Sequence, residues 1–219
     1  MVKVIDKGVI EYAKAWEFQK EIFEAISSGT DKEAGYLVYC EHPHVYTLGK
    51  SGQAGNLLVD DAFLKSIDAT FYKTDRGGDI TYHGYGQIVG YPILNLERYG
   101  LSLREYIELL EQAVINCLAR FGIEAGRISG ATGVWISSGG RERKICAIGV
   151  RASRYVTMHG FALNVNTDLN YFNYINPCGF TTKGVTSMRE ELSVKEVMFE
   201  SVKEIFTQEF DALFGEKRQ

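Results

Sequence analysis

A cysteine in the tetrapeptide Asn176-Pro177-Cys178-Gly179 has the setting in this sequence that best suits covalent chemistry. Proline fixes φ on one side of it and glycine frees the backbone on the other, which suits a sharp turn that presents a thiol for attack. Free cysteine is usually a small buried hydrophobe, so this motif alone is a weak signal. It gains weight beside Lys144, which heads an apolar strand, and His83, which a glycine follows. Together these residues predict thiol-based acyl transfer, with Cys178 as the nucleophile.

The segment Arg76-Gly77-Gly78-Asp79-Ile80-Thr81-Tyr82-His83-Gly84 is the more specific of the accompanying motifs. Paired glycines allow successive backbone N–H groups to bind one oxyanion or carbonyl oxygen. Arg76 could hold an anionic group or a structural carboxylate. For His83, a hydrogen-bonded structural histidine and a catalytic group fit the sequence equally well. The segment is not a phosphate-binding loop, because it lacks Gly-Lys-Ser/Thr after a four-residue spacer.

The apolar segment 144–151 reads as a strand headed by Lys144, although a lysine at a strand end is most often simply solvated. Period-2 alternation predicts that Lys144, Cys146 and Ile148 share one face. It places Ile145, Ala147 and Val150 on the other face. Cys146 is a rival nucleophile, but a cysteine inside an apolar strand is usually packed and inert. Gly149 would let a ligand or another backbone approach closely.

In His159-Gly160-Phe161-Ala162-Leu163-Asn164, small residues alternate with large ones. A narrow apolar tunnel for an acyl chain would need such small residues, and plain sheet packing explains them nearly as well. His42 and His44 have no acidic or thiol ligand near them in sequence, so we expect no metal site.

The bulk composition excludes several classes of protein. A net charge of −4 over 219 residues argues against general nucleic-acid binding. No apolar run approaches the roughly 20 residues that cross a bilayer, and the first residues lack a signal-peptide pattern. The cysteines (Cys40, Cys117, Cys146 and Cys178) show no Cys-x-x-Cys spacing. We therefore expect a cytoplasmic enzyme with reduced thiols.

Strand-like and helix-like segments are interspersed along the chain, without a repeat or a linker that marks a domain boundary. Strands are predicted at 2–10, 35–40, 69–74, 88–94, 134–136, 144–151 and 155–165, and a helix at 11–28. This order predicts one α/β (α+β) domain over residues 1–219, a mixed sheet with flanking helices.

Two further helices carry sequence signals for their first residues. Residues 103–121 place their apolar side chains at three- and four-residue steps, behind a Ser102–Glu105 capping box and ahead of Gly122. Ser193 and Glu196 repeat the capping-box spacing and predict the start of a C-terminal helix.

The motifs taken in order resemble those of the lipoyl(octanoyl) transferases, the octanoyl-acyl-carrier-protein:protein octanoyltransferases of lipoate synthesis. The matching segments, from about residue 40 to 190, are 41–50, 76–87 with Tyr91-Pro92, 133–135, 144–151, 159–164, 177–179 and 185–187. One residue departs from the family pattern, because Tyr85 stands where the family usually has proline.

This resemblance implies a catalytic domain similar to that of biotin and lipoate protein ligases, with Cys178 as nucleophile and Lys144 as its activating partner. It also implies an acyl site made of a larger set of residues, with His83 counted among them. The set is Arg76, Gly77, Gly78, Asp79, Ile80, Thr81, Tyr82, His83, Ala147, Ile148, Gly149, Gly160, Phe161 and Ala162.

The implied reaction moves an octanoyl group from octanoyl-acyl carrier protein to a lysine of a lipoyl domain, through a cysteine thioester and without a cofactor. The acceptors would be the E2 subunits of 2-oxoacid dehydrogenases and the H protein of glycine cleavage. It would be the first step of endogenous protein lipoylation, and we expect a monomer. Lys73, Arg76, Arg141, Arg143, Arg151 and Arg154 could form a basic patch for acidic partners.

Other functions stay open. An ATP-dependent lipoate or biotin ligase on the same scaffold needs no cysteine, so the Pro177-Cys178-Gly179 motif argues against it. A binding module would hold both protein partners and never become acylated. An amidotransferase between lipoyl domains would ignore acyl carrier protein as donor.

Overall fold

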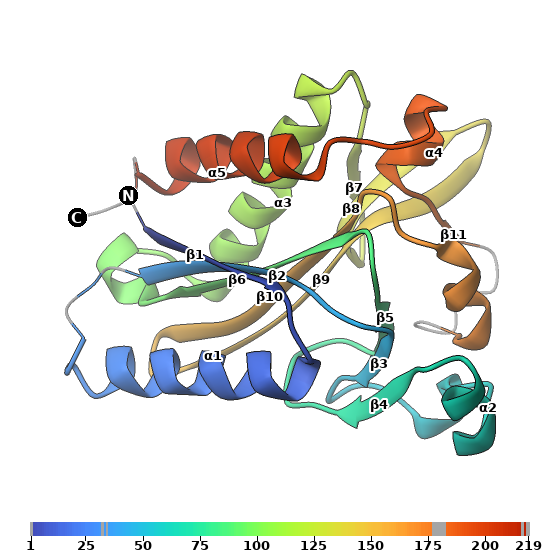
Figure 1. Ribbon diagram of the computed structural model, residues 1–219. Helices are drawn as coiled ribbons and strands as arrows, with labels where there is room; N and C mark the ends of the chain where they lie inside the picture. The colour runs from blue at the N-terminus through green and yellow to red at the C-terminus, as the bar shows by residue number, and fades with distance from the viewer. Residues whose placement is uncertain (1, 32, 34, 177–182, 216, 218–219) are drawn as a thin grey trace.

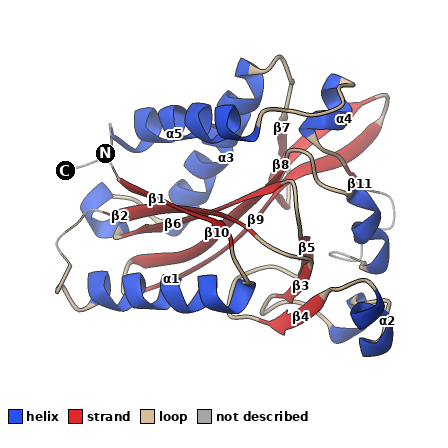
Figure 2. Cartoon of the chain, in the orientation of Figure 1, coloured by secondary structure: helices blue, strands red, loops and turns tan. Residues whose placement is uncertain are grey.

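A twisted mixed sheet with helices on both faces forms the main body of the chain (Figure 1). The computed structural model describes residues 2–31, 33, 35–176, 183–215 and 217. Within them, the main sheet has the strand order β1-β2-β6-β10-β9-β8-β7, with β11 pairing beside β9. Helix α1 lies on one face of this sheet, and α3 and α5 pack together on the other (Figure 2). The mixed α/β class predicted from the sequence is confirmed.

The elements have the following bounds in the described residues. The strands of the main sheet are β1 (Lys3–Val9), β2 (Gly35–Glu41), β6 (Gln87–Leu94), β7 (Gly126–Ile128), β8 (Ala131–Ser138), β9 (Arg141–Ser153), β10 (Val156–Asn164) and β11 (Gly184–Val185). A smaller sheet contains β3 (Val45–Leu48), β4 (Thr70–Lys73) and β5 (Ile80–His83). The helices are α1 (Tyr12–Ser27), α2 (Asp61–Ser66), α3 (Leu103–Arg120), α4 (Met188–Leu192) and α5 (Phe199–Gly215), with short 3-10 turns at Ala54–Asn56, Leu96–Tyr99 and Leu169–Tyr174.

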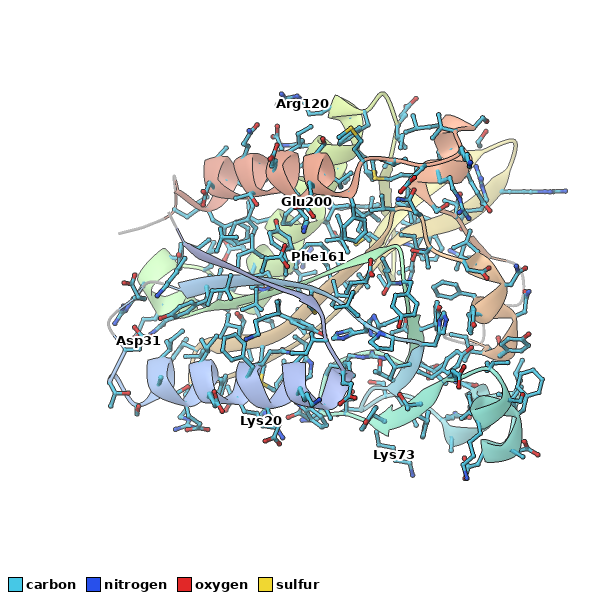
Figure 3. All side chains as sticks on the ribbon, viewed as in Figure 1. Lys20, Asp31, Lys73, Arg120, Phe161 and Glu200 are labelled. Carbon is cyan, nitrogen blue, oxygen red and sulfur yellow. The ribbon has the colours of Figure 1, made fainter. Side chains whose placement is uncertain are left out.

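The main sheet is buried on both faces, so the chain has an apolar core on each side of it. Phe161 of β10 points to the α3 and α5 face, where its ring centroid lies 4.5 Å from that of Phe206 (Figure 3). Ala162, the next residue, belongs to the cluster under α1. This alternation is the period-2 geometry of a strand. Helix α3 begins with the predicted capping box between Ser102 and Glu105, which is confirmed.

The small sheet lies beside the first turn of α1 and has an apolar cluster of its own. Tyr12, at the start of α1, has its ring centroid 5.5 Å from that of Tyr72 in β4 and 6.0 Å from that of His83 in β5. Strand β5 follows directly on the glycine-rich loop at 76–79. The small sheet therefore fixes where that loop lies relative to the main sheet.

One prediction about the strand at 144–151 is wrong, because β9 carries an irregularity. The pairing of β9 with β8 shifts register between Val134 and Trp135, which pair with Cys146 and Lys144 and leave Ile145 between them. Ile145 and Cys146 consequently both belong to the core against α3 and α5. Lys144 and Ala147 both line a pocket on the opposite face. Such an extra residue reverses the alternation beyond it.

The prediction that Ser193 caps the C-terminal helix is also wrong. Ser193 has φ +53° and ends α4, where its N–H donates to the Glu190 carbonyl at 3.1 Å. Helix α5 begins only at Phe199. The Asn166 side chain exchanges two hydrogen bonds of 2.9 Å with the backbone of Val197. These bonds occupy the backbone groups that a helix started at Ser193 would need.

Candidate active site

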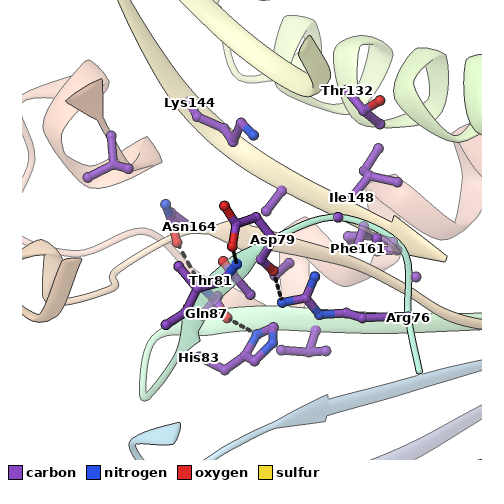
Figure 4. Close-up of a pocket in the computed structure, with 18 of the residues that line it drawn as sticks. Arg76, Asp79, Thr81, His83, Gln87, Thr132, Lys144, Ile148, Phe161 and Asn164 are labelled. Atoms are coloured by element: carbon purple, nitrogen blue, oxygen red, sulfur yellow. Dashed lines mark hydrogen bonds between the residues drawn. The ribbon is translucent and has the colours of Figure 1, made fainter. Parts of the chain in front are cut away.

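A cavity of about 270 Å³ lies between the main sheet and the loop that leads into β5. Its lining comes from β6, β9 and β10, from the loop at 76–79 with β5, and from residues 183–185 (Figure 4). Segments that are far apart in sequence thus meet at one face of the sheet. The predicted acyl-site residues line this cavity, except that Gly77 and Tyr82 are not among its lining residues.

Strand register explains why small apolar residues lie side by side on one face of this pocket. Ala147 of β9 pairs with Ala162 of β10, which pairs with Val89 of β6, and all three side chains lie on the pocket face. Two residues along each strand, Gly149 pairs with Gly160. Cross-strand neighbours on one face are only about 5 Å apart, so these small residues form a shallow apolar strip. Its composition suits an extended hydrocarbon chain.

Gly149 and Gly160 line the cavity, and they also allow neighbouring backbone segments to pack closely. A Cβ on Gly149 would lie 2.9 Å from the Gly77 carbonyl oxygen, and the Gly77 N–H donates to the Val150 carbonyl at 2.9 Å. A Cβ on Gly160 would overlap the Gly90 carbonyl of the neighbouring strand. The absence of a side chain at Gly149 therefore lets the glycine-rich loop pack against β9, and its absence at Gly160 lets β6 approach β10 closely.

The buried side chain of Arg76 fixes the conformation of the loop at 76–79. It is 7% exposed, and its guanidinium donates to the carbonyl oxygens of Thr47 and Asp79 at 2.6 Å and to the Gly77 carbonyl at 2.9 Å. Thr47 Oγ1 accepts a further bond at 3.2 Å. These bonds hold the loop against β3 through backbone carbonyls, a partner that the sequence did not suggest.

His83 lies in a buried hydrogen-bond chain with Gln87 and Asn164, and all three residues line the pocket (Figure 4). The Gln87 amide donates to Asn164 Oδ1 at 2.9 Å and to the Tyr82 carbonyl at 3.2 Å, so Gln87 Oε1 is an acceptor. His83 Nδ1–H therefore donates to Gln87 Oε1 at 2.9 Å, and His83 Nε2 faces Thr47 Oγ1 at 3.4 Å. Burial lowers the pKa of His83 well below its usual value. The imidazole is neutral at physiological pH, with Nε2 as its basic atom.

Lys144 lies at the polar end of the pocket, over the indole of Trp135. Its Nζ is 4.6 Å from the ring centroid, and Nζ of Lys183 is 5.1 Å from the same centroid. Val185 of β11 pairs with Lys144 and also borders the pocket. Cation–π contacts hold ammonium groups without neutralising them. Lys183 also forms an ion pair with Glu142 at 2.6 Å, and the Asp79 carboxylate lines the same pocket, so this end of the pocket carries charges of both signs.

Cys178 lies outside the described residues, as do residues 177 and 179–182. The described residues next along the chain, Lys183 to Val185, line the pocket. The rival nucleophile Cys146 is fully buried in the core, where burial raises the pKa of its thiol. Cys40 and Cys117 are buried as well. Among the described cysteines, none reaches the pocket.

Sequence reasoning missed several lining residues. Gln87 and Asn164 lie at the ends of recognised motifs and were not assigned a role. Buried amide side chains need hydrogen-bond partners, and this requirement was the signal that could have linked the two residues. Tyr12 lines the pocket from α1, and nothing in its local sequence indicates this.

The expected basic patch is largely neutralised. Arg143 pairs with Glu191 at 2.6 Å, Arg154 pairs with Glu24 at 3.1 Å, and Arg151 pairs with Asp75. Arg76 is buried in its loop. Among the residues that the structure describes, no helix combines the length and the apolar character needed to cross a membrane.

The fold and pocket define an α/β domain with a largely apolar cavity beside a lysine. The family model of the lipoyl protein ligase A/B catalytic domain matches residues 11–211, and the chain belongs to this family. An octanoyltransferase of Bacteroides thetaiotaomicron is 56% identical over 220 residues, covering 99% of this chain and 96% of that relative. An octanoyltransferase of Bacteroides fragilis is 58% identical over 191 residues, covering 85% and 86%. Within the family, the chain is an acyltransferase, as its resemblance to the lipoyl(octanoyl) transferases implied.

Solved structures share the fold at much lower identity. P. falciparum LipL1 in complex with lipoate has a TM-score of 0.77 at 14% identity, covering 99% of this chain and 63% of that one. The bipartite lipoate protein ligase of Thermoplasma acidophilum has a TM-score of 0.72 at 18% identity, covering 98% and 85%. The predicted likeness to the ligase catalytic domain is confirmed.

Proposed function

We propose that this chain transfers an octanoyl group from octanoyl-acyl carrier protein to a lysine of a lipoyl domain, through a thioester on Cys178. The observation that supports it most is the apolar strip of Ala147, Ala162 and Val89, in a pocket that Lys144 also lines from β9. This geometry suits a hydrocarbon tail on the strip with its acyl carbon at the charged end. The relatives named octanoyltransferase supply the identity of the acyl group.

In the first half-reaction, the Cys178 thiolate attacks the carbonyl carbon of the donor thioester. The new carbon–sulfur bond forms as the bond to the donor sulfur breaks, and the proton from Cys178 goes to the departing thiolate. An unperturbed thiol is only a few per cent ionised at pH 7, so activation is needed. The ammonium of Lys144 would favour the thiolate, or its neutral amine would take the proton.

In the second half-reaction, the amine of the acceptor lysine attacks the enzyme thioester. An amide bond forms, the carbon–sulfur bond breaks, and the amine gives up one proton, which Lys144 can accept or relay to the Cys178 thiolate. Thioester exchange is nearly thermoneutral and amide formation is downhill, so the cycle consumes no nucleotide. The acceptors would be the lipoyl domains of 2-oxoacid dehydrogenase E2 subunits and the glycine cleavage H protein.

His83 is the remaining candidate catalytic group. Its neutral imidazole, held by Gln87, leaves Nε2 beside the loop that would cover the acyl carbonyl. Replacement by asparagine keeps a donor near Gln87 and removes the basic nitrogen. A loss of more than about 100-fold in kcat with an unchanged melting temperature supports a catalytic role. A small loss assigns His83 to holding the loop.

The test mixes the protein with octanoyl-acyl carrier protein without nucleotide and records its intact mass. We expect an octanoyl adduct that hydroxylamine removes and that maps to Cys178. The Cys178→Ser variant should form no hydroxylamine-labile adduct, whereas the matched control Cys146→Ser should behave like the unchanged protein.

A ligase is the second candidate, because the solved structures with this fold that are named above include lipoate protein ligases. If a lipoyl domain is acylated only when ATP and free octanoic acid are supplied, the chain is a ligase and the thioester mechanism is wrong. Binding of both protein partners with no acylation under either condition would make it a binding module. Transfer from an octanoylated lipoyl domain alone, with acyl carrier protein ignored as donor, would make it an amidotransferase.

A further inference from the structure

A buried carboxylate on α3 lies behind the strand that carries the polar end of the pocket. Glu111 is 6% exposed. One carboxylate oxygen accepts a hydrogen bond from Arg127 Nε at 2.9 Å, and the other accepts from the backbone N–H of Gly133 at 2.9 Å. A buried charge is costly unless it is paired and hydrogen-bonded, and Glu111 is both. The proposed chemistry makes no direct use of it.

Gly133 connects this carboxylate to Lys144. Its φ of +115° favours glycine, and a Cβ there would lie 2.5 Å from the Cys146 carbonyl oxygen. The same Cβ position lies 3.5 Å from Cε of Lys144 and 3.6 Å from Cδ. The stem of Lys144 therefore crosses the bare backbone of Gly133. The conformation of that backbone decides where the ammonium lies.

The register shift between β8 and β9 begins at the next residue. Val134 pairs with Cys146, and Trp135 pairs with Lys144. The Trp135 indole, over which the ammonium lies, donates through Nε1 to the Ala131 carbonyl at 2.9 Å. Gly133 is thus the middle residue of the segment 131–135 of β8, and the hydrogen bond between the two ends of this segment fixes the Trp135 indole.

We propose that Glu111 is a positioning residue for Lys144. By accepting the Gly133 N–H it fixes the backbone on which the lysine stem rests, and so aims the ammonium at the acyl carbonyl. The importance of this for catalysis rests on the proposed function, in which Lys144 activates Cys178. The contact between Glu111 and the strand does not depend on that function.

Two substitutions of Glu111 distinguish the hydrogen bond that it accepts from the negative charge that it carries. Glu111→Gln keeps an oxygen that accepts the Gly133 N–H, and Arg127, whose side chain is 40% exposed, can bind water in place of the lost charge. Glu111→Ala removes the acceptor. A geometric role therefore predicts that glutamine rescues most of what alanine loses.

The first test is a double-mutant cycle on the rate of acyl-enzyme formation from octanoyl-acyl carrier protein. Glu111→Ala should slow this step by about 10- to 100-fold with little change in KM, since small misplacements of a catalytic group have effects of that size. Added to Lys144→Ala, the same change should cost less than about 2-fold, because Glu111 acts through Lys144. Equal losses in both backgrounds would overturn the proposal.

The second test needs no acyl donor. Lys144 is acetylated with acetic anhydride and quantified by peptide mass spectrometry against the exposed Lys195. The labelling rate of Lys144 should change at least several-fold in Glu111→Ala and stay within about 2-fold of the unchanged protein in Glu111→Gln. Glu209→Ala is the matched control, because Glu209 is a mostly buried helix carboxylate that pairs with an arginine, Arg120, at 3.0 Å. It should leave the labelling unchanged.

The two tests distinguish the failures. If the unchanged protein forms no acyl-enzyme but Lys144 labelling responds to Glu111→Ala, the proposed function is wrong and the positioning holds. If the acyl-enzyme forms and labelling is identical in all variants, the positioning is wrong and the proposed function stands.

Discussion

At the scale of single residues, Lys144 and Lys183 place two ammonium groups near the Trp135 indole, and all three side chains line the pocket. Both ammonium groups lie within about 5 Å of the Trp135 centroid, and Lys183 also pairs with Glu142 at 2.6 Å. An ammonium group beside the apolar part of a cavity favours a thiolate and a developing oxyanion that lie close to it.

Ala162 is the residue at which chain length is most easily altered. It is 3% exposed, and its side chain forms the middle of the strip between Ala147 and Val89. Leucine adds three carbons that would extend into the cavity above the strip and take up space that a long acyl tail needs. We expect Ala162→Leu to lower kcat/KM for the octanoyl donor at least tenfold and to leave a butanoyl donor within about threefold.

The measurement is steady-state transfer with both donors. Ala152→Leu is the control, because Ala152 is exposed on the neighbouring strand β9. Equal losses for the two donors would mean that the strip does not hold the acyl tail.

At the scale of elements, the starts of two helices show where sequence signals hold. Ser102 accepts the Glu105 N–H and caps α3, whereas Ser193 has a left-handed backbone and ends α4. Ser102→Ala should therefore lower the free energy of unfolding by about 1 kcal/mol. Ser193→Gly should leave it unchanged or raise it by a few tenths of a kcal/mol, since glycine suits φ +53°.

Urea unfolding monitored by circular dichroism measures both variants. A loss of about 1 kcal/mol in Ser193→Gly would mean that the residue caps a helix in solution, as its spacing from Glu196 suggested.

Long periodic elements were predictable because their signal is local. The strands at 2–10, 35–40 and 88–94 and the helix at 103–121 lie within a few residues of their observed bounds. The small sheet was predicted only in part, because β3 and β5 are four residues long and owe their pairing to distant segments. The side of the sheet that Ala147 faces depends on one extra residue in β9, which only the partner strand reveals.

The candidate site was predictable where glycines and ionisable groups share a motif. Arg76, His83 and Lys144 all line the pocket, as expected from their settings. The partners that fix them come from elsewhere in the chain: Thr47 for Arg76, and Gly133 with Glu111 for Lys144. No local pattern encodes such contacts. The role of Cys178 and a single catalytic domain over residues 1–219 stay predictions.

At the scale of the whole molecule, the layered fold buries three histidines around the junction of α1, the small sheet and the main sheet. Burial lowers the pKa of His42 to about 4, where its Nδ1–H donates to the Ile10 carbonyl and Nε2 accepts from Tyr91. Burial also lowers the pKa values of His83 and His159. In the unfolded chain each histidine titrates near 6.5. Below that pH the unfolded state binds more protons than the folded state.

Stability should therefore fall as the pH drops below about 6.5, and these histidines should contribute no pH dependence between about pH 6.5 and 7.5. Each histidine that stays neutral in the folded protein contributes a slope of about 1.4 kcal/mol per pH unit, until the pH reaches its folded pKa. Urea midpoints at pH 7.5, 6.0 and 5.0 measure the effect, and we expect the midpoint to decrease steeply over the last two. His42→Asn, in which residue 42 cannot titrate, should reduce the slope by about one histidine's share whatever its effect at pH 7.5. A midpoint that stays constant down to pH 5.0 would show that these histidines take up protons in the folded state, and the neutral His83 hydrogen-bond chain would then be wrong.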